Sequence, residues 1–94
     1  MARPAVIARR YFVRGRVQGV GFRYFVEHAA HELSLTGYTR NVDDGRVEVY
    51  AVGRAEQLSE LAGYLWKGPR FADVRGVEEQ EAAVQQYDAF SIEG

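Results

Sequence analysis

The chain has 94 residues, 47% of them hydrophobic and 27% charged, with a formal net charge of −1. The length fits one globular domain, and the charge argues against general attraction to nucleic acid or anionic membranes. With no cysteine, no apolar run of the ~18 residues that span a membrane and no signal-peptide core, the chain is expected to be a cytoplasmic enzyme or binding protein that contacts no membrane.

The N-terminal part predicts a leader, a strand and a helix. Residues 1–9 are expected to form a short, mobile leader, in which Pro4 blocks early strand pairing. From about Arg10 to Val17, side chains alternate with the period of two that is typical of a strand. From about Phe22 to Leu35, apolar residues recur at helical spacing. The glycine-rich segment between them joins this strand to this helix.

A β-hairpin is predicted next. Its strands are expected over Tyr38–Val42 and Arg46–Val52. Asp43-Asp44-Gly45 forms the turn between them, because an Asp-Gly pair readily supplies positive φ. The two aspartates lack the alternating ligand spacing of a calcium loop, so a turn is the preferred interpretation.

The C-terminal half predicts a second helix and two strands. An apolar stripe indicates the helix, which ends at Gly68-Pro69. A strand is expected within Val74–Ala83, where three glutamates suit a strand edge or a solvent-exposed face. A short last strand is expected over Asp88–Glu93. The residues of the apolar stripe are Leu58, Leu61, Ala62 and Leu65.

The order β-α-β-β-α-β predicts an α+β, ferredoxin-like sandwich over residues 1–94. In this fold one mostly antiparallel sheet carries both helices on one face. No repeat, linker or low-complexity tract divides the chain, so we expect a single domain. The fold hosts many functions, so function has to be argued from a site.

The stretch GRVQGVGFR, residues 15–23, is the candidate site. Successive backbone N–H groups in a glycine-rich turn before a helix form an anion-binding nest, which the helix dipole strengthens. Arg23 lies in the first turn, where a cation is unfavourable by several tenths of a kcal/mol unless an anion sits beside it. The stretch lacks the Gly-Lys-Ser/Thr of a Walker A loop and the Rossmann fingerprint, and Val17 replaces the cysteine of cysteine phosphatases. From the residues alone, a plain strand–helix turn is the alternative.

Two stretches resemble the signatures of the acylphosphatase family. The first, Val13-x-Gly-x-Val-Gln-Gly-Val-x-Phe-Arg23, matches at every defined position. The second, Gly37-Tyr38-Thr39-Arg40-Asn41-x-x-x-Gly45-x-Val47, is similar to the family's second signature. The resemblance extends from about Arg10 to Ile92. It implies the ferredoxin-like fold and hydrolysis of the carboxyl–phosphate bond of acyl phosphates without a metal or other cofactor, with inorganic phosphate as product and inhibitor.

By motif position, the resemblance implies that Arg23 binds the phosphate and that Asn41 orients the attacking water. The chemistry agrees, because a carboxylate leaving group needs no general acid, and the site has only to hold the phosphoryl group, neutralise its charge and place a water. Without the resemblance, Asn41 would be interpreted as a strand-end residue that starts the turn. The residues expected to bind phosphate are Gln18, Gly19, Val20, Gly21, Phe22 and Arg23.

Thr39 departs from the family, which usually carries a small apolar residue at this position. By strand alternation Thr39 points to the same side as Asn41. Its hydroxyl is expected either to replace a methyl group in the core or to hydrogen-bond near the Asn41 amide. His28 and His31 share a helix without an evident third ligand, so no metal site is expected.

The alternative function is a non-catalytic nucleic-acid- or phosphate-binding module, because RNA-recognition motifs share this element order. Such modules carry stacking aromatics in a basic signature on the third strand, whereas Val47-Glu48-Val49-Tyr50 has one aromatic beside an acid. A domain of a carbamoyl-transferring hydrogenase-maturation enzyme is a third possibility, which the chain length disfavours. The sequence therefore predicts a monomeric hydrolase with a small-molecule substrate and no nucleic-acid partner.

Overall fold

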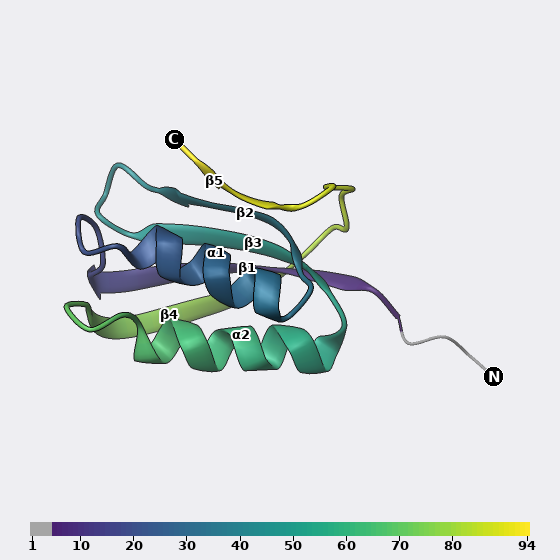
Figure 1. Ribbon diagram of the computed structural model, residues 1–94, viewed down its shortest axis with the longest axis horizontal. Coiled ribbons are helices and arrows are strands. Elements are labelled where there is room, and N and C mark those ends of the chain that lie inside the picture. Colours follow the sequence, from purple (N-terminus) through teal and green to yellow (C-terminus); the bar gives the residue numbers. More distant parts are fainter. Residues whose placement is uncertain (1–4) are drawn as a thin grey trace.

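The computed structural model describes residues 5–94, which form a mixed sheet with two helices on one face (Figure 1). The sheet has five strands in the order β4-β1-β3-β2-β5. This arrangement is the expected ferredoxin-like α+β fold. In chain order the elements are β1 Ile7–Arg16, α1 Phe22–Glu32, β2 Thr36–Asn41, β3 Val47–Gly53, α2 Ala55–Lys67, β4 Asp73–Ala82 and β5 Phe90–Glu93.

The pairing register brings two distant chain segments to the same end of the sheet. β1 and β2 flank β3, and both pair with it in antiparallel fashion. Val47, the first residue of β3, lies opposite Val13 of β1 on one side and opposite Asn41 of β2 on the other. The loop that follows β1 and the last residue of β2 therefore meet at the end of the sheet where β3 begins.

The core lies between the helices and the sheet. Tyr11 and Val13 of β1 are fully buried, as the strand alternation predicts. The Tyr11 hydroxyl donates a hydrogen bond to the carbonyl of Leu58 in α2 at 3.0 Å, and burial raises the Tyr11 pKa to about 12. The expected stripe of α2 is confirmed, because Leu58, Leu61 and Leu65 are all fully buried.

The first strand is longer than predicted. β1 begins at Ile7, three residues before the expected Arg10. Ile7 pairs with Gly53 of β3, and Ala8 pairs with both Val52 of β3 and Ala82 of β4. The prediction of a leader is therefore wrong for residues 7–9, because pairing partners on both sides extend the strand. Residues 1–4 lie outside the described part of the chain.

The first helix is shorter than predicted, ending at Glu32 instead of Leu35. Ser34 adopts a φ of 58°, and the Leu35 N–H donates to the carbonyl of Ala30 at 2.9 Å, which closes the helix end. Leu35 is buried. It fits the apolar pattern of the helix because it packs in the core, although it lies beyond the helix end. The end of the last strand, Glu93, agrees with the prediction, and the other strand boundaries differ from it by one or two residues.

The β4 edge of the sheet carries the three glutamates expected on a strand edge or solvent-exposed face. β4 is an edge strand, and the glutamates Glu78, Glu79 and Glu81 on it are exposed. Charged side chains on an edge oppose pairing with another chain. Neither helix in residues 5–94 is long and apolar enough to cross a membrane.

Candidate active site

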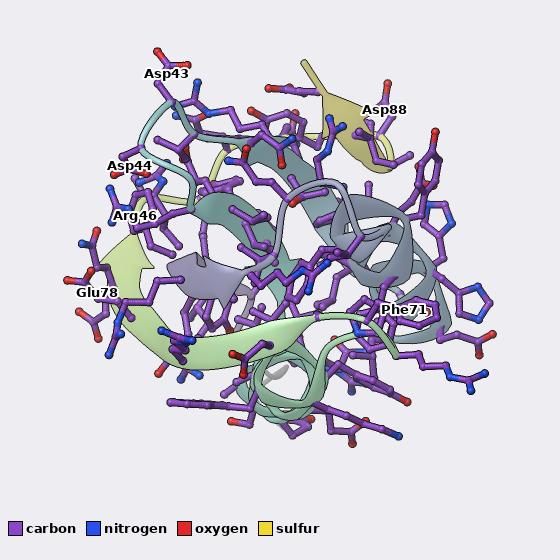
Figure 2. The ribbon with its side chains drawn as sticks, turned by 90° about the vertical axis from the view of Figure 1, so that its left-hand side faces the viewer. Asp43, Asp44, Arg46, Phe71, Glu78 and Asp88 are labelled. Atoms are coloured by element: carbon purple, nitrogen blue, oxygen red, sulfur yellow. The ribbon has the colours of Figure 1, made fainter. Side chains whose placement is uncertain are left out.

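The candidate site lies at the end of the sheet where the β1–α1 loop and the end of β2 meet. Figure 2 looks onto this end, with the hairpin turn of Asp43 and Asp44 to one side of the loop. The antiparallel register described above fixes this juxtaposition, because it aligns the ends of β1 and β2 on either side of Val47.

The loop backbone is arranged to receive an anion. Gly19 and Gly21 have φ values of 73° and 78°, in the left-handed region that glycine adopts without strain. Gly21 is the N-cap of α1, which has no side-chain cap and no acidic residue in its first turn. The first backbone bond into the helix runs from the Phe25 N–H to the Gly21 carbonyl at 3.1 Å. Within the described chain, the backbone N–H groups of residues 18–24 donate to no protein acceptor.

Arg23 adds a cation beside these amides. Its side chain is half-buried, and its Nη1 donates to the backbone carbonyl of Glu93 in β5 at 3.2 Å. Because β5 pairs with β2, this bond ties the guanidinium to the strand next to Asn41. Glu93 was not expected at the site, and nothing in the local sequence pattern indicates a contact between residues so far apart in the chain.

Arg23 and Asn41 face the same cavity, which has a volume of about 170 Å³. Asn41 is exposed at the end of β2. The structure therefore brings together both residues that were expected to be catalytic. Gln18 and Val20, which were expected to bind phosphate, do not line this cavity. The lining residues are Val17, Gly19, Gly21, Phe22, Arg23, Tyr24 and Asn41.

The Gln18 side chain, which was expected to bind phosphate, instead forms hydrogen bonds to the hairpin. Its amide Nε2 donates to the carbonyl of Val42 at 2.8 Å and to the carbonyl of Arg46 at 2.9 Å. These carbonyls lie on the hairpin that follows Asn41, so the side chain fastens the loop to the hairpin. Only the backbone N–H of Gln18 remains free to bind an anion. Val20 is partly buried and packs against the core.

Thr39 is fully buried, and its hydroxyl donates to the backbone carbonyl of Glu48 at 2.9 Å. The first of the two expectations is therefore the correct one, because the side chain occupies the core. The bond to β3 satisfies the hydroxyl, so it does not compete for the Asn41 amide.

The carboxylate of Glu48 in β3 is buried on the face of the sheet opposite the helices, where it binds side chains of β1 and β2. Glu48 is 4% exposed, and it accepts hydrogen bonds from Arg40 Nε at 2.7 Å, from Arg10 Nε at 3.0 Å and from the Tyr38 hydroxyl at 3.0 Å. Burial raises the pKa of Glu48, but the bonds and charges of Arg40, Tyr38 and Arg10 outweigh it, and the pKa lies below its ordinary value. Sequence reasoning took Glu48 only as an acid on the third strand and missed this cluster.

The two histidines do not join the site. His28 lies 3.7 Å from Glu32 on the exposed side of α1, and His31 Nε2 lies 3.0 Å from the carbonyl of Phe90. In the described residues, no group of three or more His, Asp or Glu side chains could hold a metal ion. Both histidines are exposed.

Comparison with known proteins identifies the family of this chain. The family model described as Acylphosphatase matches residues 9–92. An acylphosphatase of Solibacter usitatus (strain Ellin6076) is 68% identical over 85 residues, which cover 90% of this chain and 88% of that protein. The structure of an acylphosphatase from Coxiella burnetii superposes with a TM-score of 0.92 at 36% identity, covering 99% of this chain and 100% of that chain. An acylphosphatase from Bacillus subtilis gives a TM-score of 0.91 at 37% identity, covering 96% of this chain and 100% of that chain.

Proposed function

The chain belongs to the acylphosphatase family and is an enzyme of this class, and from that premise we propose how its own residues carry out the hydrolysis of acyl phosphates. The loop amides and Arg23 bind the phosphoryl group, and Asn41 orients the attacking water. The observation that carries this proposal is the shared cavity, in which Arg23 and Asn41 both face the glycine loop at the start of α1.

Binding of the phosphoryl group rests on three kinds of positive charge. The free loop amides and the positive end of the α1 dipole favour an anion at this position. The Arg23 guanidinium offers two parallel donors that match two phosphate oxygens. Among the described residues, Arg23 donates one side-chain hydrogen bond, to the Glu93 carbonyl, so little has to be broken for it to engage the phosphate.

Asn41 then places the nucleophile. A neutral side-chain amide both donates and accepts, so Asn41 can hold a water while its NH₂ group points toward a phosphate oxygen. The water oxygen forms a bond to phosphorus as the bond from phosphorus to the acyl oxygen breaks. The electron pair leaves with the carboxylate, which needs no proton, and the proton of the attacking water passes to bulk solvent or to phosphate.

The alternative of a nucleic-acid-binding module is disfavoured by the open face of the sheet. Tyr50, the aromatic residue of β3, is only 1% exposed. Tyr38 stacks on the Tyr50 ring, with 5.5 Å between the ring centroids. The Tyr50 hydroxyl donates to the Ala83 carbonyl at 2.6 Å. A base has no free ring to stack on at this position. We therefore propose a small-molecule enzyme without a nucleic-acid partner, which acts as a monomer in the cytoplasm.

Purified protein tests the proposal directly. It should hydrolyse an aromatic acyl phosphate at the same rate with and without EDTA. Inorganic phosphate should compete with the substrate and raise the melting temperature by mass action. Arg23→Ala should abolish both phosphate effects. Equal stabilisation of the wild type and Arg23→Ala by phosphate would contradict the assignment of the anion site.

A further inference from the structure

We propose that Tyr24 forms a subsite for the acyl group of the substrate and that it favours apolar, above all aromatic, acyl phosphates over small polar ones. This inference rests on the proposed function, because it starts from a phosphoryl group bound in the cavity of Arg23 and Asn41. It adds a selective element that the hydrolysis itself does not require.

Tyr24 is placed where the acyl group emerges. It follows Arg23 in the first turn of α1 and lines the same cavity as Arg23 and Asn41. Its side chain is nevertheless 71% exposed, so it forms part of the cavity rim and not of its floor. A cavity of about 170 Å³ that receives a phosphoryl group and a water leaves the acyl group at this rim.

The Tyr24 ring is exposed, whereas the rings of the neighbouring phenylalanines pack against other parts of the protein. Phe22 is buried in the core, and Phe25 packs edge-on against Tyr64 of α2 at 6.1 Å between ring centroids. Among the described residues, Tyr24 takes part in no aromatic pair and its hydroxyl makes no hydrogen bond to protein. An exposed ring beside a charged cavity is the kind of surface that binds an apolar group.

The geometry of in-line displacement also places the acyl group at the rim formed by Tyr24. The attacking water and the leaving oxygen lie on opposite sides of phosphorus during phosphoryl transfer. Asn41 supplies the β2 side of the cavity, whereas Tyr24 supplies the α1 side. A water held by Asn41 therefore directs the leaving acyl group away from β2, toward the rim that Tyr24 forms.

The charge of the cavity lining disfavours an acyl group that carries a negative charge of its own. Arg23 is the one charged side chain among the residues that line the cavity, and the phosphoryl group engages it. An acyl group that carries its own carboxylate would find no counter-ion there, while an aromatic group would gain contact with the Tyr24 ring.

A second exposed aromatic, Phe71, which is 71% exposed, lies at the same end of the molecule (Figure 2).

The test compares benzoyl phosphate with acetyl phosphate as probes in the wild type, Tyr24→Ala and Tyr24→Phe. Tyr24→Ala should lower kcat/KM for benzoyl phosphate about 10-fold and that for acetyl phosphate less than about 2-fold, since apolar contacts discriminate by this order. Tyr24→Phe should keep the wild-type ratio, because the ring and not the hydroxyl makes the contact. Tyr64→Ala, which removes an aromatic of α2 outside the cavity, is the matched control and should leave the ratio unchanged.

Two results would overturn the subsite. An equal loss for both substrates would show that Tyr24 acts on the phosphoryl end or on the fold, and an unchanged ratio in Tyr24→Ala would show that it does not touch the acyl group. The competitive inhibition constant of inorganic phosphate should stay constant in all three variants. That constant also separates the two proposals: loss of phosphate inhibition in Arg23→Ala tests the anion site, whereas the substrate ratio tests Tyr24.

Discussion

The side-chain amide of Gln18 donates to the backbone carbonyl of Val42 at 2.8 Å and thereby joins the glycine loop before α1 to the strand end that carries Asn41. A second bond from the same nitrogen reaches the Arg46 carbonyl at 2.9 Å. The two parts of the site thus have a direct link besides their common attachment to β3. In the proposed mechanism, the distance between the phosphoryl group at the loop and the water on Asn41 depends on this link.

Removing the link should therefore affect turnover more than phosphate binding. We expect Gln18→Ala to lower kcat about 10-fold while the inhibition constant of phosphate changes by less than about 3-fold, because small misplacements of a reacting group are costly. Gln18→Glu should lose more activity, because its carboxylate repels the two carbonyls instead of donating to them. Steady-state kinetics with phosphate as inhibitor measures both quantities, and unchanged kcat in Gln18→Ala would contradict the positioning role.

Arg23→Lys tests the need for a planar, two-pronged donor. The lysine keeps the positive charge but cannot contact two phosphate oxygens at once. We expect kcat/KM to fall at least ~100-fold, which corresponds to about 2.7 kcal/mol of transition-state stabilisation. The free energy of unfolding should change little, since within residues 5–94 the Arg23 side chain makes one hydrogen bond, an exposed one to Glu93. Near-normal kcat/KM would remove Arg23 from the mechanism.

Substitution of Asn41 separates placement of water from binding. Asn41→Ala should reduce kcat by roughly 10²–10³ and keep phosphate affinity within a few fold, because one preorganised polar contact is lost. Asn41→Asp is nearly isosteric but sets an anion beside the phosphate, so it should weaken substrate binding. If Asn41→Asp instead preserved turnover, Asn41 would be the position of a general base. A parallel loss of phosphate affinity and kcat in Asn41→Ala would indicate a structural role.

The pKa of Glu48 predicts a pH-dependent contribution to stability. Its pKa in the folded state lies below the ordinary value, so ionised Glu48 stabilises the fold above the unfolded-state pKa, and this stabilisation is lost as pH falls through the folded-state pKa. We expect Glu48→Gln to lower the free energy of unfolding by about 1–2 kcal/mol at pH 7, with a smaller difference from wild type near pH 3. Urea unfolding at the two pH values measures this.

Glu79 provides the control for that experiment. It is exposed on β4, and its carboxylate lies 3.8 Å from Arg9, an ion pair of the kind that contributes about 0–1 kcal/mol. Glu79→Gln should therefore change stability little at either pH. A Glu48→Gln difference that stayed constant with pH would mean that the Glu48 carboxylate is not the titrating group.

The local features of this protein follow from the sequence alone. Glycines at positions 19 and 21 permit the left-handed turns of the loop, and the helical spacing after Phe22 places Arg23 in the first turn. The Asp43-Asp44-Gly45 turn and the buried stripe of α2 are likewise visible in neighbouring residues. Backbone preference and hydrophobic periodicity act over a few residues, so they can be predicted without knowing what the segment packs against.

The relationships that join distant segments were decided by the tertiary structure. The start of β1 at Ile7 depends on partners in β3 and β4. Strand register and the position of α1 on the sheet decide three further features. These are the bond from Gln18 to Val42, the bond from Arg23 to Glu93 and the burial of Glu48. Side-chain contacts between strands exist only once the pairing is formed, and the pattern of one segment holds no information about the register of another.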